Sequence, residues 1–250
     1  HTKLTPADDG VGHFGSSVAL AVDGRTALVS ATYHEDAGGL SPGPAYVVGR
    51  TDGGWRQQAT LPPEDGDSTL SFGWQGGSTA LSADGTTALV GADKVDGPHG
   101  PRSGAAYAFE RTETGWGRAH KLVPEDGGSQ DFFGRSVGLS ADGTTALVGA
   151  WGHDHPDGAG SGAAYVFERA DEGWRQVATL APDSAGAFGS SVALGRDGTV
   201  ALVGAPAADE AAGADGGSAH VFRRDGAAWG QRTVLAPADG DAGDYFGGAV

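Results

Sequence analysis

The sequence predicts an all-β fold built from one four-stranded unit that is repeated along the chain. A Phe-Gly pair opens each copy, and these pairs follow one another at intervals of 58, 61, 55 and 58 residues. Within each copy, apolar and polar residues alternate as in strands, and no stretch shows helical periodicity. Because a unit of this size buries its core only against its neighbours, we expect residues 1–250 to form a single array. The copies start at Phe14, Phe72, Phe133 and Phe188, and a partial copy begins at Phe246.

The third copy illustrates the first two strands of the unit. Residues 136–141 and 144–150 alternate in the strand pattern and are rich in Val, Leu and Thr. Between them, Asp142 and Gly143 are a dipeptide that favours a two-residue type I′ turn, since both positions need positive φ. The sequence therefore predicts a tight hairpin, which recurs at Asp23-Gly24, Asp84-Gly85 and Asp197-Gly198.

The third and fourth strands complete the unit. The third strand covers residues 162–169 and is matched by residues 104–111, 44–50 and 217–224. The fourth strand starts at a Trp and stops before a Pro, which cannot donate to a strand ladder. A four-stranded antiparallel meander repeated at this spacing is the blade of a β-propeller, with the aromatic residues packed between blades. These Trp and Pro residues are Trp55, Trp116, Trp174, Trp229, Pro62, Pro124, Pro182 and Pro237.

The number of complete copies allows two interpretations of the chain. Four copies are complete, residues 1–6 resemble the end of a fourth strand, and residues 246–250 resemble the start of a first strand. Propellers usually have four to eight blades. We expect a fragment of a longer propeller, because Val250 stops where a strand should continue; the alternative is a small array whose ends pair in an unusual way.

The composition excludes several classes of partner. The formal charge is −16, with 32 acidic against 16 basic residues, so a nucleic-acid partner is not expected. The chain has no Cys, and no apolar run approaches the roughly 20 residues of a transmembrane helix. High acidity with little Lys resembles proteins from high-salt organisms. The alternative is the codon bias of a secreted protein from a GC-rich genome.

The long connections are the predicted binding surface. Connections after the second and fourth strands leave one end of the unit and vary among copies, as binding loops on rigid scaffolds do. Residues 151–157 are the densest group of possible metal ligands, with two His at i and i+2; the alternative is a solvated polar loop. We expect a protein or glycan ligand here. The candidate residues are Trp151, His153, Asp154, His155, Asp157, His34, Glu35, Asp36, Asp93 and Asp96.

Three carboxylates near the C-terminal end form a possible calcium site. Asp239, Asp241 and Asp244 are spaced so that they could surround Ca²⁺ together with backbone carbonyls. A solvated acidic surface and Asp-based turns explain the same residues. No other cofactor is implied.

The segments FGSSVAL, TALVGA and GAAYVF resemble the FG-GAP repeat of integrin α-subunit propellers and of many microbial surface proteins. This resemblance implies an extracellular or cell-surface protein with an adhesion role. Calcium-binding members carry a D-x-[DN]-x-DG loop between the first two strands, whereas this chain has only a minimal Asp-Gly turn there, Ala-Asp-Gly in the second and third copies. One carboxylate per turn cannot supply the six or more oxygens that Ca²⁺ takes. The calcium site of the family is therefore not expected at Asp23, Asp84, Asp142 or Asp197.

We expect a non-enzymatic binding scaffold. The sequence shows no G-x-S-x-G elbow, no phosphate-binding loop, no H-E-x-x-H motif and no paired acid and base. Three alternatives stay open. The first is a carbohydrate-binding propeller that uses Trp and Asp residues between blades. The second is an enzyme whose activity depends on residues 153–157, and the third is a structural array joined through its end strands.

Overall fold

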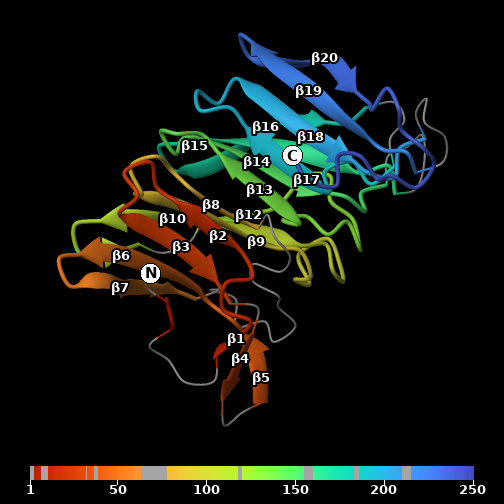
Figure 1. Cartoon of the computed structure of the whole chain (residues 1–250). Helices are drawn as coiled ribbons and strands as arrows, with labels where there is room; N and C mark the ends of the chain where they lie inside the picture. Colours follow the sequence, from red (N-terminus) through yellow and green to blue (C-terminus); the bar gives the residue numbers. More distant parts are fainter. Residues whose placement is uncertain are drawn as a thin grey trace.

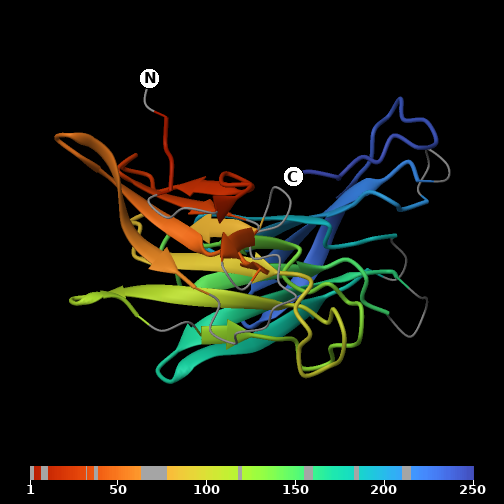
Figure 2. The same ribbon diagram turned by 90° about the horizontal axis from the view of Figure 1, so that it is seen from below.

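The computed structural model describes residues 3–6, 11–31, 33–36, 39–62, 78–117, 120–154, 160–182, 186–209 and 215–250. These residues form strands, turns and bends without a helix, so none of them builds a helix that could cross a bilayer. The strands form four large antiparallel sheets and a small one, and no described sheet closes on itself. The large sheets follow one another in chain order (Figure 1), and the second view shows them arranged in an arc (Figure 2). The predicted all-β fold with repeated antiparallel units is confirmed.

The large sheets, numbered I to IV along the chain, each contain one repeat. Sheet I consists of β2 (Val18–Leu20), β3 (Thr26–Ser30), β6 (Ala45–Thr51) and β7 (Gly54–Leu61). Sheet II consists of β8 (Thr79–Leu81), β9 (Thr87–Ala92), β10 (Ala105–Thr112) and a split outer strand, β11 (Gly115–Trp116) with β12 (His120–Leu122). Sheet III consists of β13 (Ser136–Leu139), β14 (Thr145–Ala150), β15 (Ala163–Ala170) and β16 (Gly173–Leu180). Sheet IV consists of β17 (Ser191–Leu194), β18 (Val200–Ala205), β19 (Ser218–Asp225) and β20 (Ala228–Leu235).

A small sheet branches from the first repeat. It is formed by β1 (Val11–Gly12), β4 (Tyr33–Asp36) and β5 (Gly39–Pro42), in the order β1-β4-β5. β4 and β5 lie in the connection between β3 and β6 and extend below sheet I in Figure 1. The sequence analysis treated this connection as a loop.

The strands lie within about two residues of their predicted positions, but the predicted turn type is wrong. A type I′ turn needs positive φ at both central residues. Here only the glycine of each pair has it, with φ of 71° at both Gly85 and Gly143. The loop between β8 and β9 is wider than two residues, since Ser82 N donates to Thr87 O at 2.9 Å. The Ser82 hydroxyl oxygen, which accepts from Thr87 N at 2.9 Å, stabilises this wider loop.

The described core consists of three apolar layers between neighbouring sheets and a smaller cluster around Tyr46 of sheet I. In the layer between sheets II and III, Leu89 and Ala106 pack with Phe133, Tyr165 and Phe167. Phe133 and Tyr165 are fully buried, and their rings meet edge to face with centroids 5.6 Å apart. The aromatic residues of the repeat therefore pack between the sheets, as predicted from the sequence.

The Phe-Gly pair joins each sheet to the one before it. Phe133 N donates to Ser103 O at 3.0 Å, which places the start of the third repeat on the end of the connection in sheet II. Gly134 has φ of 91°, and a Cβ there would lie 2.2 Å from Ala105 O. Only glycine combines this conformation with so close a backbone approach.

The inner strands of the four sheets also contact one another in series. The turns that follow them are connected by backbone hydrogen bonds from Val22 N to Ala83 O, from Ala83 N to Ala141 O and from Ala141 N to Arg196 O, of 2.8–3.0 Å. The sheets are thus held together along their inner edge while their outer strands diverge.

The two outer faces of the stack expose residues that are buried inside it. Leu180 of sheet III is 2% exposed, whereas the equivalent Leu235 of sheet IV is 42% exposed. At the other end, Val18 of β2 is 67% exposed, whereas its equivalent Val192 is 9% exposed. The residues of each outer face thus occupy repeat positions that, inside the stack, are buried against a neighbouring sheet.

Candidate functional site

The connections between strands lie at two opposite faces of the four sheets, which we call the turn face and the loop face. The turn face carries the connections from first to second strand and from third to fourth strand. The loop face carries the connections from second to third strand and from one sheet to the next. The predicted binding residues that the structure describes lie on the loop face, in the connections after β3, β9, β14 and β20.

A buried Asp–His pair lies on the loop face of sheet III. Asp131 Oδ2 and His153 Nδ1 are 2.8 Å apart, and the two residues are 3% and 8% exposed. Gly128 N donates to the same Oδ2 at 2.7 Å. Gly152 N donates to Asp131 O at 3.1 Å, so backbone and side-chain contacts both connect the segment before β13 to the loop after β14.

The surroundings of this pair are acidic. The hydrogen bond to Asp131 raises the pKa of His153; burial opposes this shift, and the charges of Asp126 and Asp154 add to it. The ring of Tyr165 meets the His153 ring edge to face at 5.9 Å. The pKa of its hydroxyl is raised first by burial and then by the negative charge of Asp126.

Two of the other repeats have an apolar residue at the sequence position of His153, whereas the first repeat has His34 there. Val95 in sheet II and Ala208 in sheet IV stand where His153 stands, and they are 0% and 1% exposed. Gly186 occupies the place of Asp131 in the fourth repeat. The sequence analysis did not pair Asp131 with His153. The sequence offered no signal for this pairing, because 22 residues separate the two and the first repeat has a histidine, His34, at the position of His153.

Two further candidate residues lie beside this pair. The ring of Trp151 stacks on Phe132 with centroids 5.0 Å apart and an interplanar angle of 15°. Asp154 is exposed and accepts a hydrogen bond from Gly160 N at 2.7 Å. The structure therefore brings Trp151, His153 and Asp154 together around Asp131.

Asp93 and Asp96 shape the equivalent loop of sheet II. Asp93 is 2% exposed, its Oδ2 lies 3.6 Å from Arg135 Nη1, and its Oδ1 has no hydrogen-bond partner among the described residues. Burial raises the pKa of Asp93, and the positive charge of Arg135 opposes this shift. Asp96 Oδ1 accepts from Arg102 N at 2.8 Å, which closes the loop.

The remaining candidates are less completely described. His155 and Asp157 lie outside the described residues, and for His34, Glu35 and Asp36 the structure describes only the backbone of β4. Within the described ranges, no group of three or more His, Asp or Glu residues is arranged to hold a metal ion. Asp239, Asp241 and Asp244 are exposed, and Asp244 Oδ2 accepts from Asp241 N at 2.9 Å. Calcium binding by these three residues stays a prediction.

The repeat matches a known sequence family. The profile of the FG-GAP repeat matches residues 55–109, 116–167 and 174–222. The chain belongs to the FG-GAP repeat family. Each match begins at the Trp of an outer strand and ends at an aromatic residue of the next third strand, so the family unit spans the junction between two sheets.

The fold is also found in a solved structure. The periplasmic gluconolactonase PpgL of Pseudomonas aeruginosa is similar, with a TM-score of 0.51 and 17% sequence identity over 90% of this chain and 58% of that chain. At this identity the similarity shows the fold alone. The FG-GAP chain thus corresponds to little more than half the length of PpgL. The search of curated proteins found no significant match.

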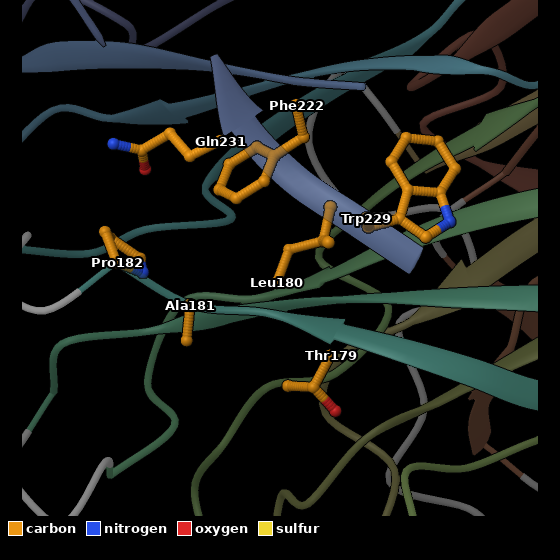
Figure 3. Close-up of a pocket in the computed structure, with 7 residues that line it drawn as sticks. All are labelled: Thr179, Leu180, Ala181, Pro182, Phe222, Trp229 and Gln231. Atoms are coloured by element: carbon orange, nitrogen blue, oxygen red, sulfur yellow. The ribbon is translucent and has the colours of Figure 1, made fainter. Parts of the chain in front are cut away.

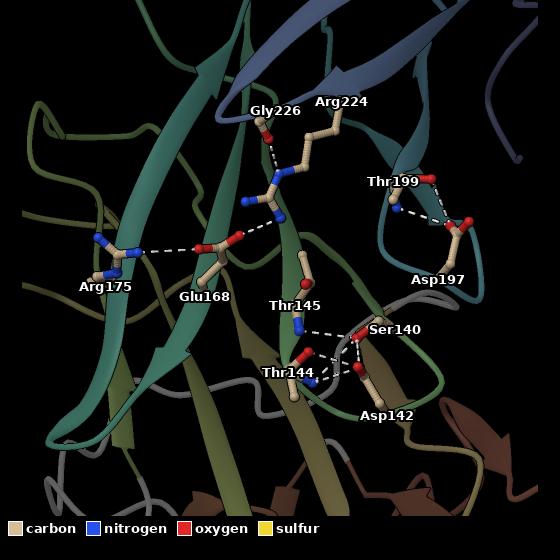
Figure 4. A network of polar contacts seen from close by, with 10 residues as sticks. All are labelled: Ser140, Asp142, Thr144, Thr145, Glu168, Arg175, Asp197, Thr199, Arg224 and Gly226. Atoms are coloured by element: carbon tan, nitrogen blue, oxygen red, sulfur yellow. Dashed lines mark hydrogen bonds and ion pairs between the residues drawn. The ribbon is translucent and has the colours of Figure 1, made fainter.

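In the FG-GAP turns between first and second strands, the aspartates accept hydrogen bonds that stabilise the turn. Asp142 Oδ1 accepts hydrogen bonds from Ser140 Oγ at 2.6 Å, from Thr144 N at 3.0 Å and from Thr144 Oγ1 at 2.8 Å (Figure 4). These bonds, first that of Ser140, lower the pKa of Asp142. Asp84 and Asp197 accept equivalent bonds from Thr86 and Thr199. The interpretation of these carboxylates as turn residues is confirmed.

Replacing Asp142 by Ala is expected to lower the free energy of unfolding by about 1 kcal/mol, because hydrogen bonds of the turn are lost. Since the pKa of Asp142 is lowered from 3.8, its contribution is present above that pH and is lost as the pH falls through the pKa of the folded state. Urea unfolding at neutral and acidic pH measures both effects. Asp23→Ala is the control, with a smaller effect, because Asp23 accepts one turn hydrogen bond, from Arg25 N at 2.8 Å.

The Asp131–His153 pair is expected to make stability depend on pH near neutrality. The pKa of His153 is raised above its ordinary value of 6.5. The pair therefore stabilises the fold fully below that pH, and its contribution is lost as the pH rises through the pKa of the folded state. We expect the free energy of unfolding to fall between about pH 6 and about pH 8. Urea titrations across this range measure how the free energy of unfolding changes with pH. The same change with pH in the variant Asp131→Leu/His153→Val would contradict the assignment.

A groove lies between the outer strands of sheets III and IV. It has a volume of about 290 Å³ and lies between β16 and β20 (Figure 3). Leu180, Phe222 and Trp229 supply its apolar lining, and Thr179 and Gln231 supply polar groups. Trp229 Nε1 has no hydrogen-bond partner among the described residues.

Proposed function

We propose that the chain is a β-propeller segment that acts outside the cytoplasm as a non-enzymatic binding scaffold. Its four sheets correspond to four blades, and its loop face recognises a macromolecule, with a protein as the first candidate. The FG-GAP family match and the propeller-like arrangement of stacked sheets support this proposal.

The contrast between the two faces is the observation that carries the proposal. On the turn face, Asp84, Asp142 and Asp197 repeat the same hydrogen bonds in three sheets. On the loop face, the position of His153 is taken by Val95 and Ala208 in the neighbouring sheets. Surfaces that only support the fold repeat their chemistry, whereas a recognition surface needs chemically distinct positions on a rigid framework.

An array of purified extracellular proteins, probed with the labelled chain, tests this proposal. We expect saturable binding to at least one arrayed protein, weakened about tenfold or more by Trp151→Ala/Asp154→Ala, since loss of an aromatic anchor typically costs more than about 1 kcal/mol. The matched control is Thr86→Ala/Thr144→Ala on the turn face, which should bind like the unmodified chain. Binding that is lost equally in both variants, or found in neither, would contradict the role of the loop face.

A glycan ligand is the second candidate, because of the groove between β16 and β20. Trp229 offers an aromatic ring, while Thr179 and Gln231 offer hydrogen-bonding groups, which is the combination of apolar lining and few polar groups found in small-ligand sites. A glycan array decides between the candidates. Binding that Trp229→Ala removes and Trp151→Ala leaves intact would favour this groove over the loop face.

The non-enzymatic part of the proposal has a direct test. PpgL is a gluconolactonase. Hydrolysis of glucono-δ-lactone by the purified chain should not exceed the rate in buffer. A rate above that background, reduced in His153→Ala, would overturn the proposal in favour of an enzyme centred on the loop after β14.

A further inference from the structure

One ring nitrogen of the buried Asp131–His153 pair is left for a ligand. Asp131 Oδ2 holds His153 Nδ1 at 2.8 Å, whereas His153 Nε2 makes no hydrogen bond to a described residue. In neutral His153 the proton lies on Nδ1, which donates to the carboxylate, so Nε2 carries a free lone pair. Because the residue is only 8% exposed, little water is available to this lone pair. The pair therefore offers a hydrogen-bond acceptor on the loop face.

Two carboxylates flank this acceptor from different segments. Asp126 precedes β13 and Asp154 follows β14, and both side chains are exposed. Their charges add to the effect of Asp131 on the pKa of His153. Asp154 Oδ1 accepts from Gly160 N, as the aspartate at this position accepts from the residue six positions later in sheets II and IV. This bond closes the loop and leaves Asp154 Oδ2 for a ligand.

An aromatic ring borders the same site. The half-buried ring of Trp151 stacks on Phe132, whose N donates to Arg102 O at 3.1 Å. A Cβ on Gly152 would lie 2.9 Å from Phe132 Cδ2, so glycine lets the loop approach this ring. Trp151 is therefore held in place before a ligand binds. The free face of an indole ring attracts a cation.

The charges of the turn face, by contrast, are paired within the molecule. Glu110 of β10 pairs with Arg169 of β15, and Glu168 of β15 pairs with Arg224 of β19. Asp126 and Asp154 form no ion pair with a described residue. The negative charge beside His153 is thus available to a cation from outside.

We propose that this site binds the ammonium group of a lysine side chain on a protein partner. The inference rests on the proposed function, since it names the group that the loop face of sheet III recognises. An ammonium group has three N–H donors and no acceptor, which matches His153 Nε2 and the carboxylates of Asp126 and Asp154. Arginine matches less well, because its planar fork prefers two parallel bonds to one carboxylate and Asp154 Oδ1 is already occupied.

Two acetylated fluorescent hexapeptides test the proposal by anisotropy in about 0.15 M salt. One alternates Lys with Gly and the other Arg with Gly. At about pH 8 we expect saturable binding of the lysine peptide, at least about threefold tighter than that of the arginine peptide. Asp126→Asn/Asp154→Asn should weaken it about fivefold or more, because two of the three acceptors lose their charge. Asparagine keeps an oxygen for Gly160 N, so the loop stays closed.

The matched control is Glu113→Gln/Asp171→Asn. It removes two exposed carboxylates from the turn face, so the net charge changes by the same amount. This control should bind the lysine peptide within about twofold of the unmodified chain, since the site itself is unchanged. Thermal unfolding checks that each variant is folded.

Protonation of His153 should weaken binding. The lysine ammonium stays charged between about pH 6 and about pH 8, whereas protonated His153 Nε2 becomes a donor with a positive charge. The other ionisable groups around the ring are Asp131, Asp126, Asp154 and Tyr165. We expect the affinity to fall at least about threefold from about pH 8 to about pH 6. Asp131→Leu/His153→Val should show no such fall.

Three results would overturn the proposal: no saturable binding of the lysine peptide, equal loss in the two double carboxylate variants, or an arginine peptide that binds as tightly. The proposed function is judged separately, by the protein array. If Trp151→Ala/Asp154→Ala weakens binding to an arrayed protein and neither peptide binds, this inference is wrong and the proposed function stands. If the lysine peptide binds as expected and no arrayed protein does, the ammonium site stands and the proposed function is wrong.

Discussion

Replacing Gly189 by Ala is expected to lower the free energy of unfolding by about 3 kcal/mol or more. Gly189 has φ of 87°, and a Cβ there would lie 2.3 Å from Ala163 O and 3.0 Å from Ala150 N. The left-handed conformation costs an alanine about 1–2 kcal/mol. Overpacking against a backbone that cannot move away adds about 1–3 kcal/mol. The substitution should therefore separate sheet IV from sheet III at their inner edge.

Gly15→Ala is the matched control for this experiment. Gly15 belongs to the same Phe-Gly motif and has φ of 93°, but nothing lies within 4 Å of a Cβ at this position. Its substitution should cost only the conformational strain of about 1–2 kcal/mol. Urea unfolding followed by Trp fluorescence compares the two variants. Equal destabilisation would mean that backbone conformation, rather than contact between sheets, explains the glycine of the motif.

Replacing Asp131 by Leu is expected to lower the free energy of unfolding by about 3 kcal/mol at about pH 6. Removing one partner of a buried ion pair leaves the other charge without compensation. His153 is 8% exposed, so water stabilises its protonated form only weakly. The loss should shrink above about pH 8, where neutral His153 no longer needs the carboxylate.

The double variant Asp131→Leu/His153→Val should recover most of this stability. The second repeat has Leu70 and Val95 at the two equivalent sequence positions, so the double variant introduces residue types that the repeat already carries there or close equivalents of them. Replacing a buried ion pair by packed apolar residues is often neutral or stabilising. Urea unfolding of the single and double variants completes the comparison. A double variant as unstable as Asp131→Leu would show that the pair does not act as a unit.

Much of the fold could be predicted from the sequence because the same pattern occurs in each repeat. Period-two alternation located strands such as Thr145–Ala150 to within two residues. The Phe-Gly pairs marked where one sheet meets the next. The turn type was not predictable from Asp-Gly alone, because the Ser82 hydroxyl accepts hydrogen bonds from the backbone amides of Thr86 and Thr87 and so stabilises a wider loop than the dipeptide indicates.

The candidate site could be predicted only in part. His153 and Asp154 stood out because residues 151–157 are the densest group of possible metal ligands, but 22 residues separate Asp131 from His153. The sequence contains no signal for which of the neighbouring carboxylates would reach the imidazole. The small sheet formed by β1, β4 and β5 was missed because a two-residue strand is too short to show a period.

The sequence by itself determined the repeat, the strand order and the residues that pack between sheets, because these depend on local periodicity and turn chemistry. The tertiary structure alone decided two features: the Asp131–His153 pair and the ion pairs of Glu110 with Arg169 and of Glu168 with Arg224 between neighbouring sheets. Each of them depends on which side chains of separate strands come within a few ångströms of one another. That proximity follows from how the sheets stack, and no local pattern encodes it.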